Sequence, residues 1–140
     1  MVEKQEKTFF QLYENESEAL FRFVSFRVAD AEKVKDILQE SYLRLWKILL
    51  KENIENERAY LYRIARNLII DSYRKTEAGS LDGLLEEGFD ISLPEGITLE
   101  EKMDAEKIKG FFRELPEKYR DIFWLRFVEE WSVKDIAEAF

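Results

Sequence analysis

Apolar side chains recur every three or four positions along most of this 140-residue chain, which is the spacing of amphipathic α-helices. Only two prolines and five glycines interrupt the pattern. Hydrophobic residues make up 46% of the chain, which is enough to build packed cores rather than remain disordered. We therefore predict an all-α fold, with two small helical domains if a linker divides the chain.

The composition changes after Lys75 in a way that is typical of a linker. Residues 76–107 hold 10 acidic and two basic side chains, whereas residues 1–75 hold 13 acidic and 14 basic ones. Four of the five glycines and one of the two prolines also fall in this acidic stretch. We predict a first domain at residues 1–76, an acidic linker at residues 77–98 and a second helical unit at residues 99–140.

Missing residue types and the net charge exclude several kinds of function. The chain has no cysteine and no histidine, so it lacks disulfides, thiolate metal sites and the commonest general base. Acidic pairs such as Glu86 with Glu87 do not indicate a catalytic pair of carboxylates, because adjacent side chains do not face each other on a helix. We expect no enzyme activity, no cofactor and no metal site. The net charge of −8 argues against non-specific coating of duplex DNA.

No segment approaches the roughly 20 apolar residues of a membrane span. The N-terminal residues MVEKQEKTFF also lack the basic and apolar regions of a signal peptide. We therefore expect a cytoplasmic protein with no membrane insertion.

The stretch RAYLYRIARNLIIDSYRK, residues 58–75, predicts a helix with two unlike faces. Its aliphatic face holds Leu61, Ile64, Ala65, Leu68 and Ser72. The opposite face is basic, with tyrosines at its borders, and holds Arg63, Arg66, Asn67, Ile70, Arg74, Tyr60, Tyr62 and Tyr73. Guanidinium groups neutralise phosphates and tyrosine rings stack on unpaired bases, so this face is typical of a single-strand nucleic-acid surface. The alternative is an ordinary solvated face, and spacing alone does not decide between the two.

A second amphipathic helix is predicted from a cap at Asp30 to about Leu50. Its core stripe is Leu38, Tyr42, Leu45, Trp46 and Leu49. Its opposite face is polar apart from one leucine, and carries Asp36, Gln39, Glu40, Leu43 and Lys47. An apolar anchor among polar groups is typical of a helix that docks on another protein, although single exposed leucines are also common on ordinary surfaces.

The C-terminal part predicts helices at about residues 99–115, 116–128 and 132–140. Ser132 is expected to cap the last of them, with Asp135 completing an S-x-x-D capping box.

Three stretches resemble, in the same order, the sigma-70 superfamily of bacterial transcription initiation factors, and in particular its small extracytoplasmic-function (group 4) members. DILQESYLRLWK, residues 36–47, resembles region 2.2, which docks on the clamp helices of the RNA polymerase beta-prime subunit. RAYLYRIARNLIIDSYRK resembles regions 2.3 and 2.4, which open and read the minus-10 promoter element. LPEKYRDIFWLRFVEEWSVKDIAEAF, residues 115–140, resembles the first part of region 4, the helix-turn-helix domain for the minus-35 element.

The resemblance implies two sets of contact residues. The polymerase-docking set is Asp36, Gln39, Glu40, Leu43, Arg44 and Lys47. The DNA-binding set is Lys51, Asn53, Asn56, Arg58, Tyr60, Tyr62, Arg63, Arg66, Asn67, Tyr73, Arg74 and Lys75. The resemblance also implies that the loop at residues 51–57 closes over a base flipped from the non-template strand. Tyr60 stands where the family often has tryptophan. Arginines of this helix can also bond internally to carboxylates, which leaves two roles open for Arg63 and Arg66.

The resemblance further implies a chain truncated within region 4, because IAEAF is followed in the family by a glycine-containing turn and a recognition helix. Without that helix, Trp131, Ile136 and Phe140 would lose packing partners, so we expect the last helix either to fray or to find a substitute contact. We predict an RNA polymerase sigma factor that acts through core-polymerase docking and minus-10 strand capture, with promoter DNA as its second partner. An anti-sigma factor is a further candidate partner. The alternative is a helical adaptor or regulator, derived from a sigma factor, that binds polymerase or an anti-sigma partner without reading DNA.

Overall fold

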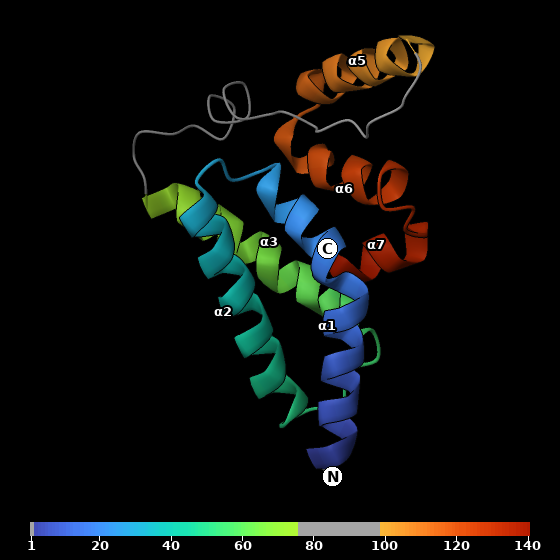
Figure 1. Cartoon of the computed structure of the whole chain (residues 1–140). Coiled ribbons are helices and arrows are strands. Elements are labelled where there is room, and N and C mark those ends of the chain that lie inside the picture. Colours follow the sequence, from blue (N-terminus) through green and yellow to red (C-terminus); the bar gives the residue numbers. More distant parts are fainter. Residues whose placement is uncertain (1, 76–98) are drawn as a thin grey trace.

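The computed structural model describes residues 2–75 and 99–140, and these ranges fold into helices joined by short loops, with no strand among them (Figure 1). The helices are α1 (Val2–Ser25), α2 (Ala31–Leu49), α3 (Glu57–Lys75), α5 (Leu99–Glu114), α6 (Glu117–Phe127) and α7 (Val133–Ala139). The predicted all-α class is confirmed. The predicted acidic linker at residues 77–98 lies outside the described residues, and the predicted domain boundaries stay a prediction.

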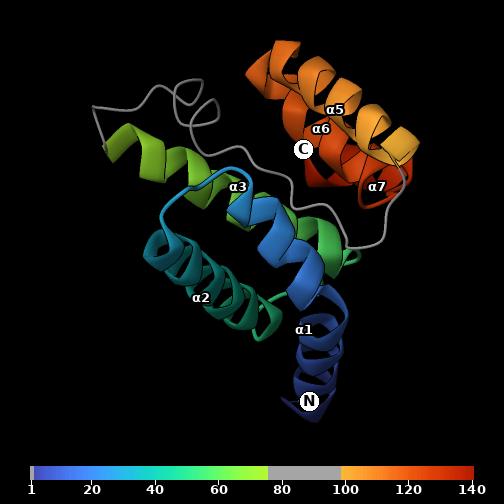
Figure 2. The ribbon, with the colours of Figure 1, turned by 45° about the horizontal axis from the view of Figure 1, so that its top comes forward.

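Helices α1, α2 and α3 pack against one another around an apolar core. Leu20 of α1, Leu45 of α2 and Leu61 of α3 are all fully buried there. This is the outcome that the helical spacing predicts, because each helix carries one apolar stripe that must leave water. The N-terminal half of α1 lies beside α2, where Phe9 packs against Tyr42 and Trp46, and it points away from α6 and α7 (Figures 1 and 2).

Side-chain caps set the starts of three helices. Asp30 caps α2 by accepting a hydrogen bond from the main-chain nitrogen of Glu32 at 2.9 Å. Ser132 caps α7 by accepting one from the main-chain nitrogen of Asp135 at 3.1 Å. Both caps were predicted, because serine and aspartate satisfy main-chain N–H groups that have no partner within the helix. Asn56 caps α3 in the same way, and the sequence analysis did not identify that role.

Helices α6 and α7 pack on the three-helix core, and α7 lies against α3 (Figure 1). The ring of Trp124 in α6 stacks on Phe26 at 4.2 Å between centroids, and Trp131 meets Tyr62 of α3 edge-on at 4.6 Å. Trp131 and Ile136 are buried as a result. The C-terminal helix therefore finds the substitute contact that was one of its two expected outcomes, and the contact surface belongs to α3.

The chain turns sharply between α6 and α7 at Glu130, whose φ of 58° lies in the left-handed region. Two main-chain hydrogen bonds close this turn, from Glu129 to the carbonyl of Trp124 and from Trp131 to the carbonyl of Leu125 at 2.8 Å. They satisfy carbonyl groups at the end of α6 and direct the Trp131 ring towards α3.

Among the described helices, none is both long and apolar enough to cross a bilayer.

Candidate polymerase and nucleic-acid interfaces

The six residues predicted for polymerase docking lie on the outer side of α2. Asp36, Gln39, Leu43, Arg44 and Lys47 are exposed, and Glu40 is half-buried. Arg44 donates from Nε to Glu40 at 2.8 Å, one helical turn apart on the same face. The side chains of Arg44 and Glu40 are 50% and 43% exposed, so solvent screens the pair, which orients the two side chains but adds little stability.

Leu43 is not an isolated apolar residue. It lines a groove of about 660 Å³ between α1 and α2, together with Glu6, Phe9, Phe10, Tyr42 and Trp46. Phe9 packs edge-on against Trp46 at 5.5 Å, whereas Phe10 is largely exposed. Sequence analysis missed the two phenylalanines, because only the packing of α1 beside α2 brings them next to Leu43. An apolar groove with polar neighbours is typical of a protein-binding surface.

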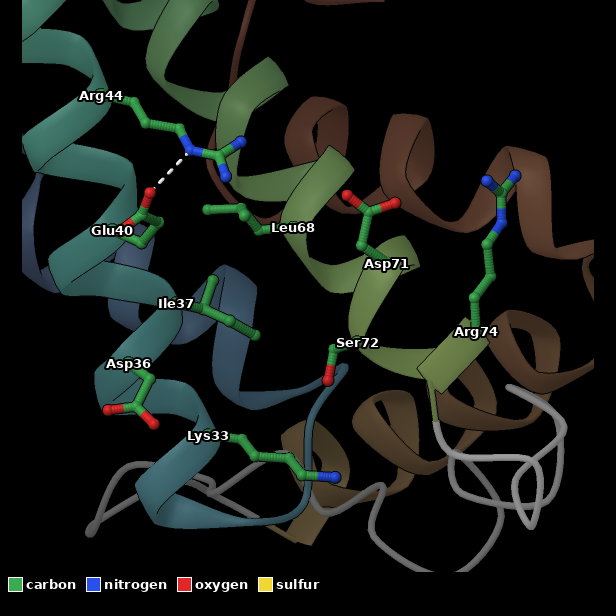
Figure 3. Close-up of a pocket in the computed structure, with 9 residues that line it drawn as sticks. All are labelled: Lys33, Asp36, Ile37, Glu40, Arg44, Leu68, Asp71, Ser72 and Arg74. Atoms are coloured by element: carbon green, nitrogen blue, oxygen red, sulfur yellow. Dashed lines mark hydrogen bonds and ion pairs between the residues drawn. The ribbon is translucent and has the colours of Figure 1, made fainter.

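A second groove, of about 450 Å³, lies between α2 and α3, and residues of both predicted sets line it (Figure 3). Its lining comprises Lys33, Asp36, Ile37, Glu40 and Arg44 of α2 with Leu68, Asp71, Ser72 and Arg74 of α3. Figure 3 shows the apolar ends of Ile37 and Leu68 between the two helices, with charged groups around them. Acidic and basic groups are present in equal number, so the lining suits a mixed-charge protein surface better than a free anion.

The DNA-binding set is divided between exposed, half-buried and buried positions. The exposed residues are Lys51, Asn53, Arg63, Asn67 and Arg74. The half-buried ones are Asn56, Arg58, Tyr60, Arg66 and Tyr73. Tyr62 is fully buried, and the side chain of Lys75 lies outside the described part of the chain.

Tyr62 does not lie on the exposed face where its spacing placed it, so the expectation that it contacts DNA is wrong for this arrangement. Its ring packs between Phe23 of α1, at 5.2 Å, and Trp131, at 4.6 Å. Its hydroxyl group lies 3.5 Å from a carboxylate oxygen of Glu16. Burial raises the pKa of Tyr62 far above its ordinary value. The physical reason is that α1 and the α6–α7 turn together cover a wider strip of α3 than its aliphatic stripe alone.

Arg58 and Asn56 both bond to acidic residues of α7. Arg58 donates from Nη2 to Asp135 at 2.8 Å, and its guanidinium lies 4.1 Å from the centre of the Trp131 ring. Asn56 donates from Nδ2 to Asp135 at 3.1 Å and also to Glu138. Asp135 therefore directs its carboxylate to α3 rather than back to the main-chain nitrogen of Ser132, so only the Ser132 half of the expected capping box is formed.

Arg63 and Arg66 are also engaged by the C-terminal helices. Arg63 donates from Nε to the main-chain carbonyl of Ala139 at 3.1 Å and from Nη2 to that of Glu138. Arg66 donates from Nε to Asp121 of α6 at 3.0 Å and lies 4.9 Å from the ring of Phe140. Of the two roles left open for these arginines, the internal one is therefore seen here, with a carboxylate for Arg66 and carbonyl groups for Arg63.

Asp121 is the most buried acidic group of this interface. It accepts hydrogen bonds from Arg27, two residues after the end of α1, and from Arg66 of α3. The side chains of Asp121 and Arg27 are 3% and 1% exposed, so their charges compensate each other in the protein interior. Sequence analysis did not identify this pair, because its members are far apart in the chain and neither belongs to a local motif.

Four of the exposed members of the DNA-binding set are not engaged by other parts of the described protein. The side chains of Lys51, Asn53, Asn67 and Arg74 are exposed and make no hydrogen bond or ion pair within the described residues. They lie in the loop before α3 and along its outer face.

No cluster of potential metal ligands occurs within residues 2–75 and 99–140.

Comparison with known proteins assigns the chain to a family. Residues 12–78 match the family description Sigma-70 region 2, and residues 106–140 match Sigma-70, region 4. The ECF RNA polymerase sigma factor SigL of Mycobacterium tuberculosis is 27% identical over 131 residues, which cover 90% of this chain and 72% of the relative. SigX of Bacillus subtilis is 27% identical over 142 residues, covering 96% of this chain and 73% of the relative. SigM of the same organism is 26% identical over 133 residues, covering 91% and 77%.

These matches confirm the resemblance seen in the sequence, and they cover both the α1–α3 core and the α6–α7 unit. The chain belongs to the sigma-70 family as an extracytoplasmic-function sigma factor, a non-enzymatic protein that works with core RNA polymerase and promoter DNA in transcription initiation.

Proposed function

We propose that this sigma factor docks on the clamp helices of the beta-prime subunit through the outer face of α2 and captures the minus-10 non-template strand on α3. The observation that carries this proposal is the groove between α2 and α3, which is lined by Asp36, Glu40 and Arg44 of the docking set and by Arg74 of the DNA-binding set (Figure 3). A partner seated on α2 would therefore lie next to DNA seated on α3. The site of action would be the cytoplasm.

The docking half of the proposal is supported by apolar exposure. Leu43 and Phe10 are 47% and 62% exposed, and both line the groove between α1 and α2. Burial of exposed apolar side chains at the centre of an interface supplies much of its binding free energy, and surrounding charges fix its orientation. We propose that Leu43 enters an apolar site on the polymerase, with Lys47 and Asp36 at its rim.

The strand-capture half is supported by exposed hydrogen-bond donors in and before α3. Lys51 and Asn53 precede α3, and Asn67 and Arg74 lie on its outer face. Lysine and arginine side chains of this kind contact phosphates, whereas asparagine amides can pair with base edges. Tyr60 is half-buried, with its ring 5.9 Å from the Arg63 guanidinium. We propose that this ring stacks on a base once the strand is in place.

Run-off transcription tests the proposal directly. Core polymerase, this protein and a library of family-type promoters should give specific transcripts that are absent without the protein. Substitution of the minus-10 element should abolish the transcripts, whereas substitution of unrelated upstream DNA should not. Core polymerase that binds this protein but shows no promoter-dependent transcript with any library member would contradict strand capture while leaving docking intact.

The second candidate function is an adaptor that binds polymerase, or an anti-sigma factor, without reading DNA. It is favoured by one observation, the engagement of Arg58, Arg63 and Arg66 by α6 and α7. Binding of single-stranded minus-10 oligonucleotides separates the two functions. Strand capture predicts sequence-dependent binding whose logarithm falls with the logarithm of salt by about 0.7 per phosphate contacted. An adaptor predicts no sequence dependence.

A further inference from the structure

A small polar pocket of about 200 Å³ lies between the first turns of α1 and the loop that leads into α3. Its two apolar lining residues are Leu49, at the end of α2, and Ile54, in the loop. The other six lining residues are polar: Lys4, Gln5 and Thr8 of α1, Glu52 and Asn53 before α3, and Glu57 in the first turn of α3. We call this the α1–loop pocket. Its α1 residues precede the segment that matches Sigma-70 region 2, which begins at residue 12, and none of them belongs to the predicted DNA-binding set.

The α1–loop pocket adjoins the surface to which the proposed function assigns the DNA strand. Asn53 belongs both to the lining of the pocket and to the exposed hydrogen-bond donors of that surface. Lys51, another of those donors, lies in the same loop. A strand that follows these donors would therefore have a base within reach of the pocket.

The charge and size of the pocket favour a neutral base over a phosphate group or a protein helix. Its lining holds one ammonium group, of Lys4, and two carboxylates, of Glu52 and Glu57, so its net charge is negative. A phosphate group would be repelled by this charge. The pocket measures about 200 Å³ against about 660 Å³ for the groove beside Leu43, so it suits a single flat ring. Apolar side chains of the lining can contact the faces of such a ring, while the polar ones contact its edge.

Gln5 brings to the pocket a buried acceptor without a partner. The residue is half-buried, and its Oε1 atom is buried and accepts no hydrogen bond within the described residues. A buried amide oxygen without a donor is unfavourable, and a donor that reaches it removes the cost. The terminal amide can rotate about its last carbon–carbon bond, which would present this oxygen to a donor placed in the pocket. The carboxylates of Glu52 and Glu57 add oxygens that only accept when ionised, so the lining favours a ligand with an N–H group.

We propose, on the basis of the strand capture proposed above, that the α1–loop pocket receives one unpaired base of the minus-10 strand and selects adenine or cytosine, with Gln5 as the specificity-determining residue. Adenine and cytosine carry an amino group at the ring position where guanine and thymine carry a carbonyl oxygen. Glutamine pairs with the amino group of adenine, and carboxylates accept from that of cytosine. A carbonyl oxygen at this place would instead meet acceptors and leave Gln5 Oε1 without a donor. Lys4 and Asn53 supply donors for the ring nitrogen beside the amino group.

The test uses the whole chain bound to core polymerase, with three single substitutions in α1. Gln5→Leu removes the amide and keeps a side chain of similar size. Gln5→Glu keeps an acceptor at the same place and serves as the rescue. Gln11→Leu is the matched control, because Gln11 is an exposed glutamine of the same helix that does not line the pocket. Labelled minus-10 non-template oligonucleotides carry each of the four bases in turn at every position, and fluorescence anisotropy gives their dissociation constants.

At one position, the unsubstituted complex should bind adenine or cytosine about tenfold more tightly than guanine and thymine. Gln5→Leu should reduce this preference to about threefold or less, whereas Gln11→Leu should leave it unchanged. Gln5→Glu should keep the preference, although its added charge weakens the binding of every oligonucleotide alike.

Two results would overturn the inference and leave the proposed function standing, provided that binding still depends on the minus-10 sequence. One is the absence of an amino-base preference at every position in the unsubstituted complex. The other is a preference of equal size in Gln5→Leu and Gln11→Leu. Binding that depends on no base at any position would overturn both the inference and strand capture.

A measurement on the unsubstituted protein covers the case in which Gln5→Leu misfolds. At the selected position, adenine is replaced by purine, or cytosine by 2-pyrimidinone, and each of these analogues lacks only the amino group. The complex should bind the analogue about tenfold more weakly, because Gln5 then has no donor. The two replacements also distinguish adenine from cytosine as the selected base. Unchanged affinity for both analogues would contradict recognition through the amino group.

Discussion

The guanidinium of Arg58 lies 4.1 Å from the centre of the Trp131 ring, so a basic residue at the start of α3 holds an aromatic residue from the turn between α6 and α7. The Trp131 ring also has an apolar contact, because it packs edge-on against the ring of Tyr62 with 4.6 Å between the ring centroids. The indole is therefore enclosed by α3 on the side where DNA is expected to bind. This one side chain couples the packing of the C-terminal helices to the core.

Trp131→Ala should lower the free energy of unfolding by about 3–5 kcal/mol, because it removes a buried indole and leaves a cavity against Tyr62. Urea denaturation followed by circular dichroism measures the change. Trp46→Ala is the matched control, since Trp46 is only half-buried at the groove beside Leu43 and should cost less. A loss at Trp46 as large as that at Trp131 would contradict the enclosed position of the latter.

Asp121→Asn should be strongly destabilising, because it leaves the charge of Arg27 buried without a carboxylate. Loss of one partner from a buried ion pair costs about 3–5 kcal/mol. The double substitution Arg27→Met with Asp121→Leu should recover a large part of that loss, because it removes both buried charges. Urea denaturation of the three proteins provides the comparison. A double variant that is less stable than Asp121→Asn would show that the pair has no compensating role.

Local rules predicted the helices from α2 onwards and the caps at Asp30 and Ser132, whereas they could not predict the contacts between distant segments. Spacing placed Leu61 inside and Leu43 outside, and the cap at Asp30 follows from the chemistry of one turn. Tyr62 was misplaced because the burial of a residue at the border of a stripe depends on what packs there, and here that is Trp131. Asp121 was missed because its partners, Arg27 after the end of α1 and Arg66 of α3, are distant in the sequence, and no local pattern predicts such contacts.

Leu43→Glu should weaken binding to core polymerase by about tenfold or more, because it introduces a charge into the apolar groove between α1 and α2. Leu50→Glu is the matched control, since Leu50 is 46% exposed against 47% for Leu43 but does not line that groove. Surface plasmon resonance with immobilised core polymerase measures both. If the two substitutions weaken binding equally, the groove is not the docking surface.

Arg74→Ala should reduce the salt dependence of oligonucleotide binding by about 0.7 in the logarithmic slope, because one phosphate contact would be lost. Arg74 is exposed and bonds to nothing within the described residues, so its substitution should leave the stability of the fold almost unchanged. The comparison is Arg63→Ala, which also removes the hydrogen bond to Ala139 and should therefore loosen α7. Fluorescence anisotropy across a salt series measures the slope. A slope that is unchanged in Arg74→Ala would remove this residue from the strand-capture surface.

Glu16→Gln should stabilise the protein increasingly as the pH rises. Burial raises the pKa of the Glu16 carboxyl above its ordinary value of 4.5. The Arg58 guanidinium, whose Nε lies 3.8 Å from Glu16 Oε1, lowers this pKa, but its effect is smaller than that of burial. A raised pKa in the folded state gives stability that is fully present below pH 4.5 and is lost as the pH rises through the folded pKa. Glutamine does not titrate, so the variant avoids this loss. The difference in free energy of unfolding between variant and unsubstituted protein should therefore grow from pH 4 towards neutrality and then level off, as urea denaturation at a series of pH values would measure. A difference that stays constant, or shrinks, over this range would show that Glu16 retains its charge in the fold without penalty.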